Sequence, residues 1–68
     1  MSGNKKLGEK IQRLRKQTGL SQEEFAEKLK ISRTHVGHVE QGRKYPSVKL
    51  LEKTAKALKV KVSELFYP

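Results

Sequence analysis

The absence of cysteine constrains this 68-residue chain more than any other feature of its sequence. Without thiols the chain forms neither disulfides nor thiolate metal sites, which are common supports of very small domains. A domain of this size buries only about 60% of the surface of its extended chain, so its core is small. A metal-free bundle of helices is the economical way to stabilise such a chain. We therefore expect residues 1–68 to form one all-α domain.

Apolar residues recur at spacings of three and four along most of the chain, which is the pattern of amphipathic helices. The first stripe lies within residues 7–14, and residues 1–5 before it are expected to be a flexible N-terminus. A final "VSELF" at 62–66 allows one more short helix. The stripes are Leu7, Ile11 and Leu14; then Phe25, Ala26 and Leu29; then Val36 and Val39; and then Val48, Leu51, Ala55 and Leu58. The sequence predicts five helices and no strand.

Serines precede these stripes where helix N-caps are expected, and glycines follow two of them as stops. Ser21 with Glu24 three residues later forms the capping-box pattern. The other expected caps are Ser32, Ser47 and Ser63, and the expected stops are Gly19 and Gly42. Only residues 30–32 separate the second helix from the third. Two short helices joined so closely are typical of a helix-turn-helix unit, which we place at about residues 21–42.

The third helix carries an unusual polar face. If Arg33 is placed at 0°, Val36 and Val39 fall at about 300° and 240°, so the buried face centres near 270°. The opposite face holds Arg33, Thr34, Gly37, His38 and Gln41. It lacks lysine–glutamate pairs and offers groups that hydrogen-bond to base edges. A glycine within a helix costs roughly 1 kcal/mol relative to alanine. Gly37 is therefore either a tolerated weak spot or a place where the helix lies close to another surface.

The net charge of +9 and the isoelectric point of about 10.1 suit a polyanionic partner, such as nucleic acid or an acidic membrane. They are also compatible with lysines that only keep a small protein soluble. No apolar run approaches the ~18 residues of a membrane span. Surface binding to a membrane would need an outward apolar face, whereas these stripes are needed inside. The start "MSGNKK" lacks the apolar region of a signal peptide, so we expect a cytoplasmic, nucleoid-associated protein.

The run "LSQEEFAEKLKISRTHVGHVEQGRKYPSVKLLEKTAKALKVKVSELF" resembles the phage Cro/repressor-type helix-turn-helix family. The resemblance covers residues 7–66 and rests on "LSQEEFA", "VGHVEQG", "YPS" and "AKAL" occurring together. It implies a compact five-helix bundle of the lambda-repressor-like type with a central helix-turn-helix. It also implies a regulator of transcription, expected to be a repressor, that binds double-stranded DNA as a dimer on a palindromic operator.

Roles follow from the resemblance by position. It implies base reading for Arg33, Thr34, Gly37 and His38, and phosphate contacts for Gln22, Arg43 and Lys44. The family residue that matches Gln22 often contacts a base as well. Glu40 lies near the end of the third helix, where the helix dipole disfavours a carboxylate, so it needs a cation. The resemblance places Arg15 of the first helix beside it. We therefore expect a buried or half-buried structural ion pair between Arg15 and Glu40.

The chain departs from the family at three positions. The family usually has glycine where Lys30 and Lys59 stand, and an apolar residue where Thr54 stands. If the backbone is left-handed at the two lysines, each is strained by roughly 1 kcal/mol; otherwise the turns differ slightly in shape. None of the three lies on the proposed reading face. They therefore affect the expected local stability rather than the expected function.

A weak homodimer is the expected assembly, chiefly because of the resemblance. On the wheel of the fourth helix, Leu50 and Ala57 lie off the main apolar stripe. With Phe66 and Tyr67 they would form a small apolar patch for self-association. In the simpler alternative, Phe66 packs in the core and Leu50 is a lone exposed leucine, which is common on protein surfaces.

Other classes of function find less support in the sequence. His35 and His38 have the spacing of a zinc-binding pair, but nothing nearby completes a four-ligand shell. No carboxylate pair, nucleophile–base set or glycine-rich phosphate loop points to an enzyme, and no cofactor is expected. The main alternative is a protein-interaction module, such as an antitoxin or co-regulator domain. DNA binding would fall steeply with salt concentration, whereas a protein-contact module would show little salt dependence.

Overall fold

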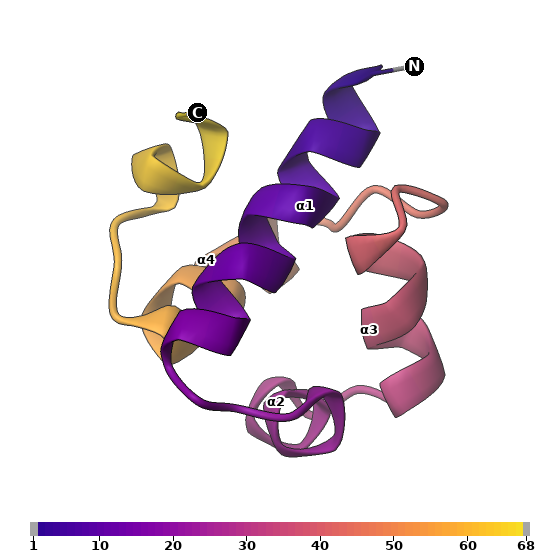
Figure 1. Cartoon of the computed structure of the whole chain (residues 1–68), viewed down its shortest axis with the longest axis vertical. Coiled ribbons are helices and arrows are strands. Elements are labelled where there is room, and N and C mark those ends of the chain that lie inside the picture. Colours follow the sequence, from indigo (N-terminus) through magenta and orange to yellow (C-terminus); the bar gives the residue numbers. More distant parts are fainter. Residues whose placement is uncertain (1, 68) are drawn as a thin grey trace.

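A computed structural model describes residues 2–67, with the side chains of residues 4–67. The elements, shown in Figure 1, are α1 (Ser2–Gln17), α2 (Gln22–Leu29), α3 (Arg33–Glu40), α4 (Val48–Leu58) and the 3₁₀ helix η1 (Val62–Phe66). No strand occurs in this part of the chain. The described residues therefore form an all-helical fold, as predicted, but with four α-helices and a terminal 3₁₀ helix in place of the five helices expected.

The last element differs from the prediction in type and in cap. η1 begins at Val62, directly after Lys61, so Ser63 lies inside the element and is not its N-cap. The Lys61 N–H instead donates to Oε1 of Glu64 at 2.9 Å. A segment of five residues is typical of 3₁₀ geometry, which is used in short pieces.

The other predicted serine caps are confirmed. The Ser21 hydroxyl accepts the Glu24 N–H at 3.0 Å, and the Ser21 N–H donates to Oε1 of Glu24 at 2.9 Å, which completes the capping box. The hydrogen bond from the Ser21 N–H, followed by that from its hydroxyl, lowers the pKa of Glu24. Ser32 and Ser47 cap α3 and α4 in the same way through their hydroxyls. Local sequence signals therefore determine where three of the four α-helices begin.

The two lysines that stand where the family usually has glycine both have a left-handed backbone conformation. Lys30 ends α2 with φ 59° and Lys59 ends α4 with φ 61°. In each case the next residue donates back to the helix: the Ile31 N–H bonds the Ala26 carbonyl, and the Val60 N–H bonds the carbonyl of Ala55. These bonds close the helix ends as a left-handed cap does. The left-handed backbone on which the expected strain depends is therefore present at both positions.

The buried face of α4 differs from the predicted apolar stripe at two residues. Val48 is 73% exposed, whereas Leu50 is buried at 8% exposure. Thr54 is also buried, so the buried arc of α4 runs from about 200° to 340° when Val48 is set at 0°. This arc is wide because α4 packs against α1, α2 and η1 together. Leu50 therefore belongs to the core and is not available for the predicted dimer patch.

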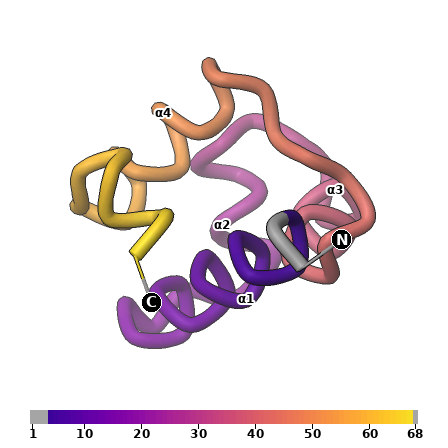
Figure 2. Tube along the Cα trace, turned by 90° about the horizontal axis from the view of Figure 1, so that it is seen from above, coloured from indigo at the N-terminus to yellow at the C-terminus, as the bar shows by residue number. Residues whose placement is uncertain are grey.

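The N-terminal half of α1 lies against the end of α3, as Figure 2 shows. Gly8 is buried there, and a Cβ added to it would lie 2.4 Å from the Val39 carbonyl oxygen and 2.5 Å from that of Glu40. Gly42 has φ 78°, and a Cβ on it would lie 2.8 Å from the Cα of Lys5. Residues 2–5, for which we expected flexibility, form the first turn of α1, and the contact at Lys5 gives that turn a neighbour.

Candidate nucleic-acid interface

The helix-turn-helix consists of α2, a three-residue turn and α3. α2 ends at Leu29, the left-handed Lys30 reverses the chain, and the Ser32 cap starts α3 at Arg33. Val36 and Val39 are buried, and α3 packs against α1 and α2. α3 therefore lies at the periphery of the molecule with one side turned outward (Figure 1). This is the arrangement in which a second helix of such a unit can enter a major groove.

The outward side of α3 carries the polar residues that the sequence singles out. Arg33, Thr34 and Gln41 are exposed, and Gly37 and His38 are half-buried. Apart from its two chain neighbours and the nearby backbone of α3 itself, a Cβ added to Gly37 would meet no heavy atom of the described chain within 4 Å. Packing within the molecule therefore gives no reason for a glycine at this position. The structure brings the four residues assigned to base reading onto one solvent-facing helix of eight residues.

The inward end of α3 is held by a buried polar network around Glu40. The Arg15 Nε donates to Oε2 of Glu40 at 2.6 Å, and its Nη2 donates to Oε1 at 3.2 Å. The Arg15 Nη1 also donates to the Leu20 carbonyl oxygen at 2.9 Å. The side chains of Arg15 and Glu40 are only 8% and 1% exposed. The expected structural ion pair is thus present, and it is bidentate and buried, which is the strongest geometry for such a pair.

Two glutamines complete this network. The Gln22 Nε2 donates to Oε1 of Glu40 at 2.9 Å, and the Gln12 Nε2 lies 3.5 Å from the same oxygen. The family resemblance implies a phosphate contact for Gln22, yet its amide nitrogen bonds Glu40 and the residue is half-buried. In the residues whose side chains are described, every buried side-chain nitrogen or oxygen has a hydrogen-bond partner. The network is therefore fully satisfied, which is the condition for a buried polar group to stabilise a fold.

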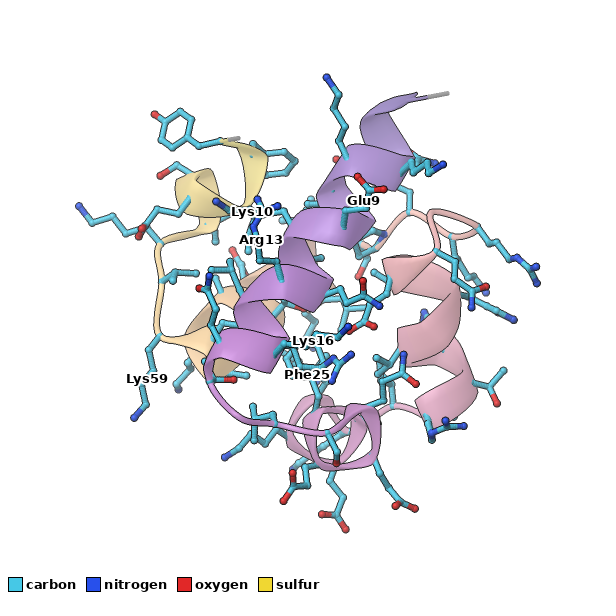
Figure 3. The ribbon with its side chains drawn as sticks, in the orientation of Figure 1. Glu9, Lys10, Arg13, Lys16, Phe25 and Lys59 are labelled. Carbon is cyan, nitrogen blue, oxygen red and sulfur yellow. The ribbon has the colours of Figure 1, made fainter. Side chains whose placement is uncertain are left out.

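The residues assigned to phosphate contacts beyond α3 lie in the loop that follows it. Arg43 and Lys44 are exposed, and their N–H groups bond the His38 carbonyl oxygen at 2.8 and 3.3 Å. The loop is therefore anchored to the last turn of α3, and its two cations stand next to the outward face. Lys59 lies on the side of the molecule away from α3, as Figure 3 shows. Basic residues thus occur on several faces, and charge alone does not locate the interface.

Two residues of this region were missed by sequence reasoning. Gly8 allows the close approach of α1 to the carbonyl end of α3, and Gln12 adds a donor near Glu40. The sequence did contain a signal for Gly8. A glycine inside a predicted helix costs about 1 kcal/mol of helix propensity relative to alanine, as at Gly37, so its presence next to the apolar Leu7 called for a reason. No sequence signal pointed to Gln12, since a single glutamine on a helix is ordinarily solvated.

Neither a metal site nor a membrane span was found in the described residues. Between residues 2 and 67, no group of three or more His, Cys, Asp or Glu side chains could hold a metal ion. No helix in that same part of the chain is long and apolar enough to cross a bilayer.

Solved structures provide close matches to this architecture. The restriction-modification controller protein C.AhdI from Aeromonas hydrophila superposes with a TM-score of 0.93 and 36% identity, over 97% of this chain and 100% of that one. The biofilm regulator SinR, solved in complex with DNA, superposes with a TM-score of 0.83 and 32% identity, over 90% of this chain and 98% of that one. Both identities exceed 30% over nearly the whole length of both chains.

Sequence relatives are regulators by name. The control protein C.MunI of a Mycoplasma species is 40% identical over 62 residues, which span 90% of this chain and 84% of that protein. The immunity repressor protein of Bacillus phage phi105 is 37% identical over 59 residues, which span 87% of this chain but 41% of that protein. The model of the HTH_3 helix-turn-helix family matches residues 11–65, most of the sequence. The chain belongs to the HTH_3 helix-turn-helix family.

Proposed function

We propose that this protein is a sequence-specific regulator of transcription that inserts α3 into the major groove of double-stranded DNA. The repressor named among its relatives supports repression as the outcome. The observation that carries the proposal is the contrast between the two sides of α3. Its outward side presents hydrogen-bonding groups and an uncrowded glycine, while its inward end is fixed by the buried Glu40 network. A rigid helix with donors and acceptors on one face suits base reading.

Each polar residue has a role that its position supports. Arg33 heads α3, where its planar fork can pair with the two major-groove acceptors of guanine. Thr34 contacts a thymine methyl group or a phosphate, and His38, one turn further along, bonds a base edge. The cations of Arg43 and Lys44 lie in the following loop, which does not enter the groove, so they hold the DNA backbone.

A homodimer on a palindromic operator forms part of this proposal. Its contact consists of Phe66 and Tyr67, which are 53% and 64% exposed, without the buried Leu50. Ala57 is half-buried against the core and contributes little area. Three basic residues, Lys6, Lys10 and Arg13, and one acidic residue, Glu9, line the same groove as the two aromatic residues, so its net positive charge opposes self-association. The free dimer is therefore weak and forms mainly on DNA.

The dimensions of the molecule agree with this assembly. Its extents are 27 × 22 × 21 Å, and half-sites one helical turn apart are separated by about 34 Å. Two copies therefore fit side by side on successive major grooves of one DNA face.

Selection of bound sequences from a random duplex pool tests the proposal. We expect one palindromic consensus, bound by two copies, with an affinity that falls steeply as salt rises. A pool without enriched sequences, together with salt-independent retention of a protein partner, would identify an interaction module instead. An asymmetric consensus bound by one copy would remove the dimer but keep the reading role of α3.

A further inference from the structure

A groove lies between α1 and η1, and no residue of α3 lines it. Its volume of about 480 Å³ is within the range of about 300–1,000 Å³ that is typical of ligand pockets. Its apolar residues are Leu7 and Leu65, which are buried, and Phe66 and Tyr67, which are exposed. Exposed aromatic side chains beside buried leucines are characteristic of a surface that contacts another molecule.

Cations line the α1 side of this groove. Lys6, Lys10 and Arg13 follow one another at spacings of four and three residues, so they form one stripe along the helix. Figure 3 shows Lys10 and Arg13 on the side of α1 that is turned toward η1. Glu9 is the one acidic residue in the lining, so the groove has a net positive charge. The cations and the aromatic residues thus lie on the two walls of one groove.

A second basic hollow shows what distinguishes the α1–η1 groove. This hollow is lined by Lys28, Lys30, Lys53, Lys56 and Ala57, and its lining contains neither an aromatic nor an acidic residue. Cations without apolar neighbours are what an ordinary solvated surface offers. The α1–η1 groove adds exposed aromatic rings to the cations, and it therefore favours a ligand that is both acidic and apolar.

Charge decides between the candidate occupants of the groove. A second copy of this chain has a net charge of +9. It also brings the same cations to the contact, because a symmetric dimer places the same patch of both subunits face to face. An acidic segment of another protein instead pairs its carboxylates with the three cations of α1 and packs its apolar side chains against the two aromatic residues. Such a segment gains from both walls, whereas a second copy gains only from the aromatic one.

We propose that the α1–η1 groove binds an acidic and apolar segment of a partner protein, and that this segment controls assembly on DNA. The second part rests on the proposed function, in which Phe66 and Tyr67 form the dimer contact, whereas the binding itself does not. A segment that covers these two aromatic residues excludes the second copy, so segment and copy compete for one surface. Cooperative binding to a palindromic site is then lost, while the reading helix of each copy stays free.

The binding test uses a synthetic peptide in which aspartate and leucine alternate. In an extended peptide successive side chains point to opposite sides, so the aspartates can face α1 while the leucines face η1. Residues on the same side are about 6.6 Å apart, close to the rise of about 6 Å between Lys6 and Lys10 along α1. One control peptide has asparagine in place of aspartate, and the other has serine in place of leucine. We expect both to bind at least about fivefold more weakly than the probe, since each loses one of the two contacts.

Two charge reversals of equal size test the location of the site. Arg13→Glu changes an exposed cation of the groove, and Lys53→Glu changes an exposed cation of the second hollow, which shares no lining residue with the groove. We expect Arg13→Glu to weaken the probe roughly 3- to 30-fold, because an exposed attraction becomes a repulsion of similar size. For Lys53→Glu we expect an affinity within about twofold of the wild type, as for an independent site. Lys6→Glu repeats the test at the other end of the stripe.

Three results of the peptide experiments would overturn the groove as a docking site. The first is a probe that binds no more tightly than its two controls. The second is an equal loss for Arg13→Glu and Lys53→Glu, which would mean that the probe follows the overall charge of the protein. The third is retention on phosphatidylserine vesicles by a protein that does not bind the probe, which would identify a lipid surface as the occupant.

A DNA titration with and without the probe tests the control of assembly. It compares the palindromic duplex with a duplex that carries one half-site, and the protein is saturated with peptide. We expect the probe to abolish cooperative binding to the palindrome and to leave the half-site affinity within about twofold. Equal weakening on both duplexes would mean that the peptide competes with DNA at α3, and this result would refute the control of assembly. A wild-type protein without sequence preference would refute the proposed function instead, and the peptide binding would still be measurable.

Discussion

Replacing each of two helical glycines by alanine should have opposite effects on stability. Gly8 and Gly37 both lie within helices, so either substitution gains the same helix propensity, about 1 kcal/mol. The surroundings differ. The new methyl group at position 37 would meet no heavy atom within 4 Å outside its two chain neighbours and the nearby backbone of α3. At position 8 it would lie 2.4 and 2.5 Å from two carbonyl oxygens of α3.

The magnitudes follow from these distances. For Gly37→Ala nothing offsets the propensity gain, so the free energy of unfolding should rise by about 1 kcal/mol. In a domain of this size that raises the melting temperature by roughly 4–8 °C. For Gly8→Ala, α1 must move away from backbone atoms that have no rotamer to change, and overpacking of this kind costs up to about 3 kcal/mol. The net change is a loss of up to about 2 kcal/mol, so the melting temperature should fall.

Thermal and urea unfolding, followed by circular dichroism at 222 nm as the conventional helix signal, measure both variants against the wild type. DNA titration then separates stability from function. If the outward face of α3 lies against base edges, the methyl group at position 37 should weaken specific binding about 5- to 150-fold, the equivalent of an overpacking cost of 1–3 kcal/mol. The expected Gly37→Ala protein is thus more stable than the wild type and a poorer DNA binder.

Two results would refute this reasoning. A destabilised Gly37→Ala protein would mean that the glycine has a role within the molecule that its open surroundings do not reveal. A stabilised protein with unchanged DNA affinity would mean that close approach to DNA is not the reason for the glycine. The Gly8→Ala variant is the control for the method, because a rise in its stability would show that the α1–α3 contact yields easily.

Three further predictions concern strain, the buried pair and DNA reading. Lys30→Gly and Lys59→Gly should each raise the free energy of unfolding by about 1 kcal/mol, because glycine adopts the left-handed backbone without a Cβ penalty; unchanged melting of both would argue against strain. Glu40→Ala should lower it by about 3–5 kcal/mol, since the Arg15 guanidinium would remain buried without its carboxylate; wild-type melting would contradict this. Arg33→Ala should cost about 1–3 kcal/mol on the selected sequence and much less on random DNA, whereas Lys44→Ala should weaken both alike and reduce the salt slope by about one unit. Equal losses for Arg33→Ala on both DNAs would exclude α3 as the reading element.

Local features were well predicted from the sequence. The capping box at Ser21 and the hydroxyl caps of α3 and α4 involve residues three apart, so a short stretch of chain contains all that is needed to recognise them. The turn between α2 and α3 was identified for the same reason. The outward face of α3 was also predicted from helical periodicity. Its two valines lie on one side of this eight-residue helix, so the opposite side, which has no apolar residue, was expected to face outward.

Other features depended on the tertiary structure, because they are set by how many neighbours an element has. Val48 was predicted to be buried but is exposed, and Leu50 was predicted to lie off the buried stripe but is buried. The reason is that three elements pack against α4 and widen its buried arc. Gln22 could not be assigned to Glu40 from a spacing of 18 residues, because only the packing of α2 against α3 brings the two side chains within hydrogen-bond distance. Gly8 likewise looked like any helical glycine until the carbonyl end of α3 was placed against it. Periodicity and capping act within a few residues of chain, whereas these contacts depend on the relative placement of whole helices.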